Sequence, residues 1–178
     1  MVACARVDLQ VRLRRDRVPI GGTVVALRGM VRALSCRVEQ LSAAKPAVVY
    51  DVLMDFERWS DWMPTVSAAS WELEGAPDTG VGGIRRVRVG LTVTHDRIVE
   101  GTRPHHHAYA VALPWYSPLK DYRGDVRIED LPSGCLIVWA TTCAVRIPGF
   151  GKFLQSTLHT TYTRLAAALA QEAERTAL

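Results

Sequence analysis

Three consecutive histidines, His105, His106 and His107, are the residues whose type and spacing first suggest a metal site. A metal ion needs several ligands on one side of it. Neighbouring residues of a β-strand point to opposite faces, so His106 cannot bind the same ion as the histidines beside it. The sequence places no carboxylate or cysteine at helical or hairpin spacing from them. We therefore expect no metal ion and no cofactor.

Nucleophilic catalysis also lacks its usual partners. It needs a serine or cysteine beside a base that a third group holds in place, and the sequence has no G-x-S-x-G motif and no cysteine–histidine signature. Cys36, Cys135 and Cys143 lie in apolar, strand-like stretches, where a thiol behaves as a small buried hydrophobe. Such cysteines fit a reducing compartment, and we expect the protein to be cytoplasmic.

Acid–base chemistry on a carbonyl substrate would need a titratable or hydroxyl side chain inside a dry cavity. The catalytic candidates are Tyr122, His107 and Tyr109, and His95 and Arg97 are further options. In the alternative interpretation, both tyrosines fill the core with satisfied hydroxyls, and His95 and Arg97 face solvent. The sequence favours this alternative, so the catalytic residues stay unassigned.

The basic residues are concentrated at one end of the chain. Residues 1–30 carry six arginines and two aspartates, whereas residues 31–178 carry 16 basic and 16 acidic residues, which gives a net charge of +4. Nucleic-acid binding needs a clustered basic face, and the short run of Arg85, Arg86 and Arg88 indicates a solvated strand face instead. No run reaches the ~18 apolar residues of a membrane-spanning helix. We expect neither nucleic-acid binding nor stable membrane insertion.

Residues 1–29 form a basic N-terminal extension that differs from the pattern after it. Residues 7–13 alternate like a strand, but four charged residues and a Gly21-Gly22 break follow. Either the extension packs as an additional hairpin, or the natural start of the protein is Met30. We favour the second explanation because a domain pattern begins immediately afterwards. The sequence thus predicts one domain over residues 30–178.

The domain pattern opens with a strand and two short helices. Residues 31–39 alternate apolar and polar side chains, which is typical of a half-buried strand. Pro46 suits the first turn of a helix over residues 46–56. A second short helix is predicted over residues 57–63. We expect it to end before Pro64, because the residue before a proline disfavours the helical conformation.

Six segments of strand composition follow, separated by turn residues and never by helices: 66–73, 84–89, 91–101, 105–113, 119–131 and 135–146. They predict an antiparallel meander with one face toward a core. The chain then ends in a long helix that opens at Pro148-Gly149 and reaches about residue 173. Its apolar residues lie three or four positions apart on one stripe: Phe150, Leu154, Leu158, Tyr162, Leu165 and Leu169.

A curved sheet wrapped around this helix would leave a pocket between them, because the two surfaces cannot interdigitate along their whole length. We place Trp59 and Trp62 near the mouth of that pocket. We expect ligand contacts from the strands, from the helix and from one loop: Tyr122, Tyr109, Trp139, Thr141, Leu154, Leu158, Thr161, Tyr162, Leu165 and Trp115.

Several short segments, taken in order, resemble a known family: residues 44–53, Trp59, residues 104–109, residues 121–124, Trp139 and residues 148–151. Together they are similar to the START-like (SRPBCC) superfamily, and within it to the polyketide cyclase/dehydrase-like branch. The resemblance spans residues 31–170. It implies an α+β helix-grip fold, in which a curved antiparallel sheet wraps around a long C-terminal helix and two short helices follow the first strand. It implies a ligand cavity but no single reaction.

Three functions are compatible with the sequence. The leading hypothesis is the binding of a small hydrophobic or aromatic molecule, such as a lipid or polyketide, between the sheet and the C-terminal helix. The second is a polyketide aromatase/cyclase or dehydratase, in which a cavity Tyr, His or Arg polarises a carbonyl. The third is a protein-interaction module with a collapsed cavity. The sequence identifies no ligand and leaves open whether the protein forms a homodimer.

Overall fold

The computed structural model describes residues 33–147, 149 and 151–178. The predicted extension over residues 1–29 lies outside these residues, and so does Phe150. Seven of the described segments form one antiparallel sheet with the strand order β1-β7-β6-β5-β4-β3-β2. The strands are β1 (Ala33–Ser42), β2 (Val66–Leu73), β3 (Ile84–Val89), β4 (Thr92–Thr102), β5 (His106–Ala112), β6 (Leu119–Leu131) and β7 (Gly134–Val145).

The meander predicted from turn residues is confirmed. From residue 66 onward, each strand end lies within one residue of its predicted position. β1 shows the predicted alternation, because Leu34, Cys36 and Val38 are buried while the residues between them are exposed. β1 pairs with β7, so the first and last strands lie side by side at one edge of the sheet.

The two short helices are present, but both are shorter than the predicted ranges of residues 46–56 and 57–63. Helix α1 (Pro46–Met54) ends two residues before the predicted boundary at residue 56, because Asp55 leaves the helical conformation with φ −80° and ψ 58°. Phe56 instead begins a 3₁₀ turn, η1 (Phe56–Arg58). Its ring packs edge-on against the Trp71 ring, with the two ring centroids 4.7 Å apart. Helix α2 (Trp59–Trp62) follows and ends before Pro64.

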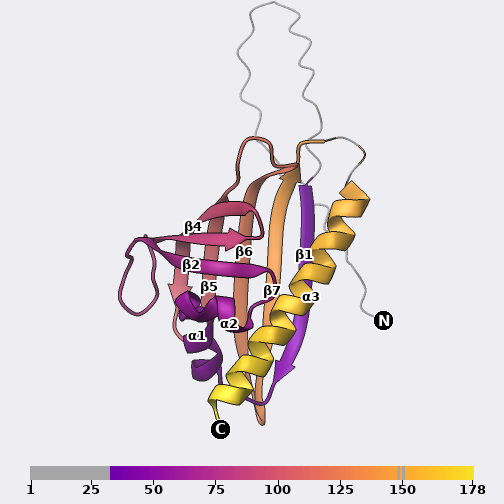
Figure 1. The fold of residues 1–178 in the computed structure, drawn as a ribbon. Coiled ribbons are helices and arrows are strands. Elements are labelled where there is room, and N and C mark those ends of the chain that lie inside the picture. Colours follow the sequence, from indigo (N-terminus) through magenta and orange to yellow (C-terminus); the bar gives the residue numbers. More distant parts are fainter. Residues whose placement is uncertain (1–32, 148, 150) are drawn as a thin grey trace, which may run out of the picture.

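The long helix α3 (Gly151–Thr176) crosses the concave side of the curved sheet (Figure 1). Near its C-terminal end, the Glu174 carboxylate accepts hydrogen bonds from Ala43 N at 2.8 Å and from Ser42 Oγ at 3.1 Å. These bonds attach the helix to the end of β1. The arrangement confirms the predicted α+β helix-grip fold.

Burial along α3 is uneven. Tyr162 and Leu169 of the predicted stripe are buried, but Leu154, Leu158 and Leu165 are only half-buried. Close packing is concentrated in the C-terminal half of the helix, where small residues such as Ala166 and Ala173 meet the core. The N-terminal half therefore leaves space between helix and sheet.

Gly124 on β6 leaves room for the Tyr109 side chain. It pairs with Tyr109 of β5, and the Tyr109 ring lies directly over it. A Cβ added at residue 124 would lie only 2.6 Å from Cε1 of that ring, well inside van der Waals contact. Glycine at this position thus determines where the Tyr109 side chain lies.

We predict that Gly124→Ala lowers the free energy of unfolding by roughly 1–3 kcal/mol, because the new methyl group overpacks the Tyr109 ring. Urea denaturation would measure the change, and a double-mutant cycle with Tyr109→Leu provides the control. The cost of Gly124→Ala should shrink when the ring is absent. An equal cost in both backgrounds would contradict this interpretation.

Candidate functional site

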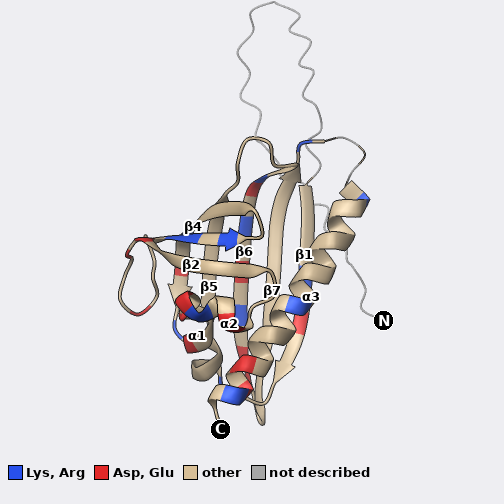
Figure 2. Ribbon diagram, viewed as in Figure 1, with Lys and Arg blue, Asp and Glu red and all other residues tan. Residues whose placement is uncertain are grey.

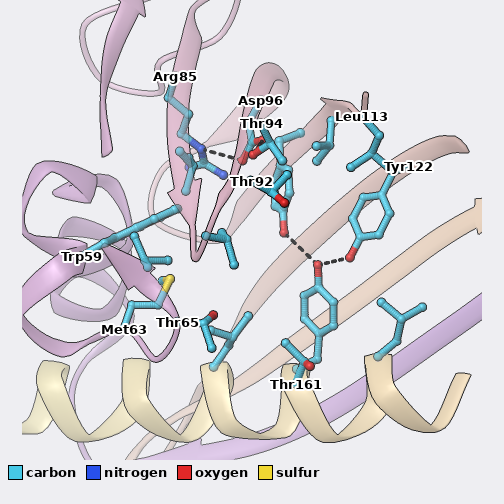
Figure 3. Close-up of a pocket in the computed structure, with 18 of the residues that line it drawn as sticks. Trp59, Met63, Thr65, Arg85, Thr92, Thr94, Asp96, Leu113, Tyr122 and Thr161 are labelled. Atoms are coloured by element: carbon cyan, nitrogen blue, oxygen red, sulfur yellow. Dashed lines mark hydrogen bonds and ion pairs between the residues drawn. The ribbon is translucent and has the colours of Figure 1, made fainter. Parts of the chain in front are cut away.

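A cavity of about 320 Å³ lies between the sheet and α3 (Figure 3). Its walls are mainly aliphatic and aromatic, and they come from α2, from strands β2 to β7 and from α3. The lining residues are Trp59, Met63, Thr65, Val66, Arg85, Val87, Val89, Thr92, Thr94, Asp96, Tyr109, Val111, Leu113, Tyr122, Trp139, Leu158, Thr161, Tyr162 and Leu165.

The structure brings together seven of the residues predicted to contact a ligand: Tyr109, Tyr122, Trp139, Leu158, Thr161, Tyr162 and Leu165. The other three lie outside the cavity wall. Thr141 is buried in β7, and Leu154 lies one helical turn before the first lining residue of α3. Trp115 is 82% exposed in the loop after β5. Ligand contact by Thr141, Leu154 and Trp115 remains a prediction, and none of the three lines this cavity.

Three tyrosines meet across the cavity. The Tyr162 hydroxyl of α3 forms a short hydrogen bond with the Tyr122 hydroxyl of β6 and a longer one, 3.4 Å, with the Tyr109 hydroxyl of β5. Trp139 Nε1 donates to the Tyr109 hydroxyl at 3.2 Å. Burial raises the pKa of each tyrosine. All three hydroxyls therefore stay protonated near neutral pH and link the helix to the sheet.

Arg85 and Asp96 supply the charged groups of the cavity. Arg85 is 1% exposed and its Nε donates to Asp96 Oδ2 at 3.3 Å, while Thr94 Oγ1 donates to Asp96 Oδ1 at 3.0 Å. The Arg85 guanidinium also lies 4.5 Å from the Trp59 ring centroid and 4.8 Å from that of Tyr109. A buried cation is thus held between a carboxylate and two aromatic faces.

The prediction that Arg85 belongs to a solvated strand face is wrong. Arg86 and Arg88 are exposed, but Arg85 has the parity of the buried Val87 and points inward. The sequence contains a pattern that could have indicated the burial of Arg85. A hairpin centred on Gly90-Leu91 pairs Arg85 directly with Asp96, as the structure shows, and an acid opposite a base at inward-facing positions indicates a buried ion pair.

His107 lies next to Arg85 but does not line the cavity. It is 1% exposed, and its Nε2 is 3.4 Å from Arg85 Nη1. Burial, with the Arg85 charge nearby, holds the pKa of His107 well below its ordinary value. The ring is therefore neutral and accepts from Arg85 through Nε2, which places its proton on Nδ1. That atom has no hydrogen-bond partner among the described residues.

The neighbouring histidine confirms the alternation expected in this strand. His106 lies on the opposite face, where its Nε2 is 3.0 Å from Asp125 Oδ2. His95 and Arg97 are exposed, as the solvent-facing alternative stated, and His95 contacts Glu72. Among the described residues, no group of three or more His, Cys, Asp or Glu could hold a metal ion.

Two cysteines of the described strands, Cys135 and Cys143, are poor nucleophiles. Cys143 is buried, and burial raises its pKa to about 11. Burial likewise raises the pKa of Cys135 to about 11. Neither side chain lines the cavity. Both thiols stay protonated near neutral pH, which leaves them unsuited to nucleophilic attack.

The sequence of the chain matches a known protein family. The family model described as polyketide cyclase/dehydrase and lipid transport matches residues 33–174. The chain belongs to this family. The resemblance to the START-like superfamily is thereby confirmed, while the family description covers both enzymes and lipid carriers. No curated protein sequence matches the chain.

Several solved structures share the fold. StfQ, a di-domain aromatase/cyclase from the steffimycin biosynthetic pathway, aligns with a TM-score of 0.65 and 13% identity over 82% of this chain and 50% of its own. The Zhui aromatase/cyclase from Streptomyces sp. R1128 aligns with a TM-score of 0.66 and 18% identity, covering 81% of this chain and 95% of its own.

A START superfamily protein from Mycobacterium smegmatis has a TM-score of 0.62 and 18% identity, covering 80% of this chain and 97% of its own. The present chain therefore spans about half of the di-domain StfQ and nearly all of the two smaller proteins. At these identities, the likeness shows the fold alone.

No helix in the described part of this family member is long and apolar enough to cross a membrane.

We predict that His107 makes stability depend on pH. Because its pKa is lower in the folded protein, the unfolded chain takes up a proton first as the pH falls through about 6.5. The stability contribution is fully present above that pH and is lost on acidification, by at most about 1.4 kcal/mol per pH unit.

Urea denaturation between about pH 7 and about pH 5 would measure this slope. His107→Gln should flatten it, whereas the exposed His159→Gln should leave it unchanged. The slope is the readout, so the comparison holds even if His107→Gln lowers stability at every pH. Equal slopes in the wild-type protein and in both variants would contradict a buried neutral histidine.

Proposed function

We propose that the protein binds a small, mainly aromatic molecule in the cavity, with an oxygen atom of that molecule next to Arg85. The observation that carries this proposal is an apolar and aromatic cavity with one buried guanidinium in its wall. Within the described residues, Asp96 and His107 engage two of the five N–H donors of Arg85. We assign the ligand oxygen to the remaining donors, since Arg85 belongs to the cavity wall.

The size of the cavity supports a compact ligand. A cavity of about 150 Å³ accommodates one benzene ring, so 320 Å³ suits a molecule of roughly two rings or a short acyl chain. Trp139 and Tyr162 offer flat apolar surfaces with ring centroids 5.5 Å apart. Aromatic ligands pack favourably against such rings.

Binding fits these residues better than catalysis does. An aromatase/cyclase must remove a proton from carbon and polarise a carbonyl oxygen. Arg85 and the tyrosine hydroxyls are suited to polarisation, which keeps the enzyme as a second candidate. The base is harder to assign, because Asp96 is the sole carboxylate among the lining residues, and Arg85 and Thr94 already occupy its oxygens.

The third hypothesis requires a collapsed cavity. The cavity of about 320 Å³ does not meet that requirement. The buried hydrogen-bonded tyrosines also limit how far α3 can move toward the sheet, because closer packing would displace Tyr162 from Tyr109 and Tyr122. We therefore retain ligand binding as the function that these residues support best.

We predict that Leu158→Trp abolishes the binding of 2-naphthol, a two-ring probe with one hydroxyl group, because the added rings fill the cavity. Isothermal titration calorimetry would measure affinity in each variant. Thr157→Trp adds the same side chain to the exposed face of the same helix, and it should keep wild-type affinity. Unchanged binding in Leu158→Trp would place the ligand elsewhere.

We also predict that the protein prefers 2-naphthol to naphthalene by roughly 10- to 100-fold, since a hydrogen bond to a buried charged donor is stronger than one between neutral groups. Replacing the pair together, as Arg85→Met with Asp96→Leu, avoids an unpaired buried charge. This double variant should still bind naphthalene but lose the preference. Arg86→Met on the outer face is the matched control and should keep it. A preference that survives in the double variant would exclude Arg85 as the oxygen-binding group.

A further inference from the structure

Four large apolar side chains are exposed at one end of the molecule. Trp115 is 82% exposed, Tyr116 64%, Ile147 44% and Phe153 67%. We call these four residues the apolar rim. An exposed cluster of this kind marks an interaction site more often than a chance arrangement.

Local contacts join two of the segments that carry the rim. Arg146 Nη1 donates to Trp115 O at 2.9 Å, and Arg146 N donates to Pro118 O at 2.8 Å, so the loop after β5 is attached to the end of β7. Ile147 follows directly, and α3 begins at Gly151, close to Phe153. Figure 1 shows these loops and the start of α3 at the upper end of the molecule.

The rim lies just beyond the cavity wall. Leu113 lines the cavity two residues before Trp115, and Leu158 lines it five residues after Phe153. None of the four rim residues lines the cavity itself. The rim therefore borders the cavity without being part of the proposed ligand site.

Basic residues surround the rim. Lys120, Arg123 and Arg146 line a surface hollow beside it, and Lys152 lies in the first turn of α3. Figure 2 shows Lys or Arg at the start of α3 and in the segment after β7. Arg123 is paired with Glu100 at 2.7 Å, and Asp121 is the acid in the hollow. The remaining three cations leave this end with a positive charge.

We propose that the apolar rim docks on the surface of a bilayer that contains anionic lipids. Trp and Tyr favour the interface between headgroups and acyl chains, and surrounding Lys and Arg are attracted to anionic headgroups. The combination is typical of proteins that lie on a membrane without crossing it. A second copy of the chain is a poorer partner because it would bring the same positive charges together.

Docking at this position would place the cavity next to the bilayer. An apolar ligand could then pass between the membrane and the cavity with little exposure to water. The docking surface does not depend on the proposed ligand, because its residues lie outside the cavity wall. Membrane binding and ligand binding can therefore succeed or fail separately.

The test is cosedimentation of the full chain with vesicles of phosphatidylcholine alone and of equal parts phosphatidylcholine and phosphatidylglycerol. We expect binding to the anionic vesicles, little binding to the neutral ones, and a marked loss of binding at high salt. Trp115→Ser with Phe153→Ser should weaken anionic-vesicle binding by roughly tenfold or more. Leu41→Ser, at a residue 64% exposed near the opposite end of the sheet, should not weaken it.

A second pair of variants tests the charges. Lys120→Gln with Arg146→Gln should weaken binding to anionic vesicles by roughly 25-fold, at about fivefold for each charge. Arg127→Gln is the matched control away from the rim, and it should have no effect. If a variant is poorly soluble, quenching of tryptophan fluorescence by brominated lipid in the wild-type protein supplies the same test.

Three results would overturn the proposal. The first is the absence of binding to either kind of vesicle. The second is equal loss of binding in the rim variants and in their controls. The third is a wild-type dimer in analytical ultracentrifugation that Trp115→Ser converts to a monomer, which would make the rim an interface between copies of the chain.

Discussion

The burial of the Arg85 guanidinium is the constraint on which the rest of the site depends. Moving a cation out of water costs several kcal/mol unless close partners replace the lost hydration. Arg85 obtains those partners from three directions: the Asp96 carboxylate on the adjacent strand, the neutral His107 ring, and the faces of Trp59 and Tyr109. Loss of any one partner would leave part of the lost hydration of Arg85 uncompensated. The side chains around Arg85 in the cavity wall are therefore arranged as partners of one buried charge, which apolar side chains alone could not stabilise.

The remaining architecture places that charge in the wall of a cavity between the sheet and α3. Gly124 lets the Tyr109 ring lie flat on β6, and the Tyr109 and Tyr122 hydroxyls hold Tyr162 of α3 at a fixed distance from the sheet. Close packing in the C-terminal half of α3 anchors the helix, whereas its N-terminal half leaves the space between helix and sheet open. Membership of the polyketide cyclase/dehydrase and lipid transport family is consistent with such a cavity. The polar groups within the cavity distinguish one ligand class from another.

Hydrophobic periodicity and turn residues were sufficient to predict the fold. The alternation in β1 and the spacing of Tyr162 and Leu169, two helical turns apart, correctly predicted which side chains are buried, because a wrong register would expose apolar surface. The charged part of the site was missed because Arg85 was interpreted together with its neighbours instead of with Asp96, its partner across the hairpin. Thr141 and Leu154 were assigned to the cavity from shared faces, which indicate a side of the sheet or helix but not how far the cavity extends. Trp115 was assigned because it is an aromatic residue in a loop near the expected pocket, which does not tell whether the side chain reaches the cavity. The depth and ends of a cavity depend on tertiary packing, and periodicity carries no information about them.

The most direct test of this account is a crystal structure of the protein with 2-naphthol. We predict electron density for the naphthol between Trp139 and Leu158, with its hydroxyl oxygen within hydrogen-bonding distance of the Arg85 guanidinium. Density outside the cavity, or a cavity closed by side chains around an Arg85 that faces solvent, would contradict the central claim.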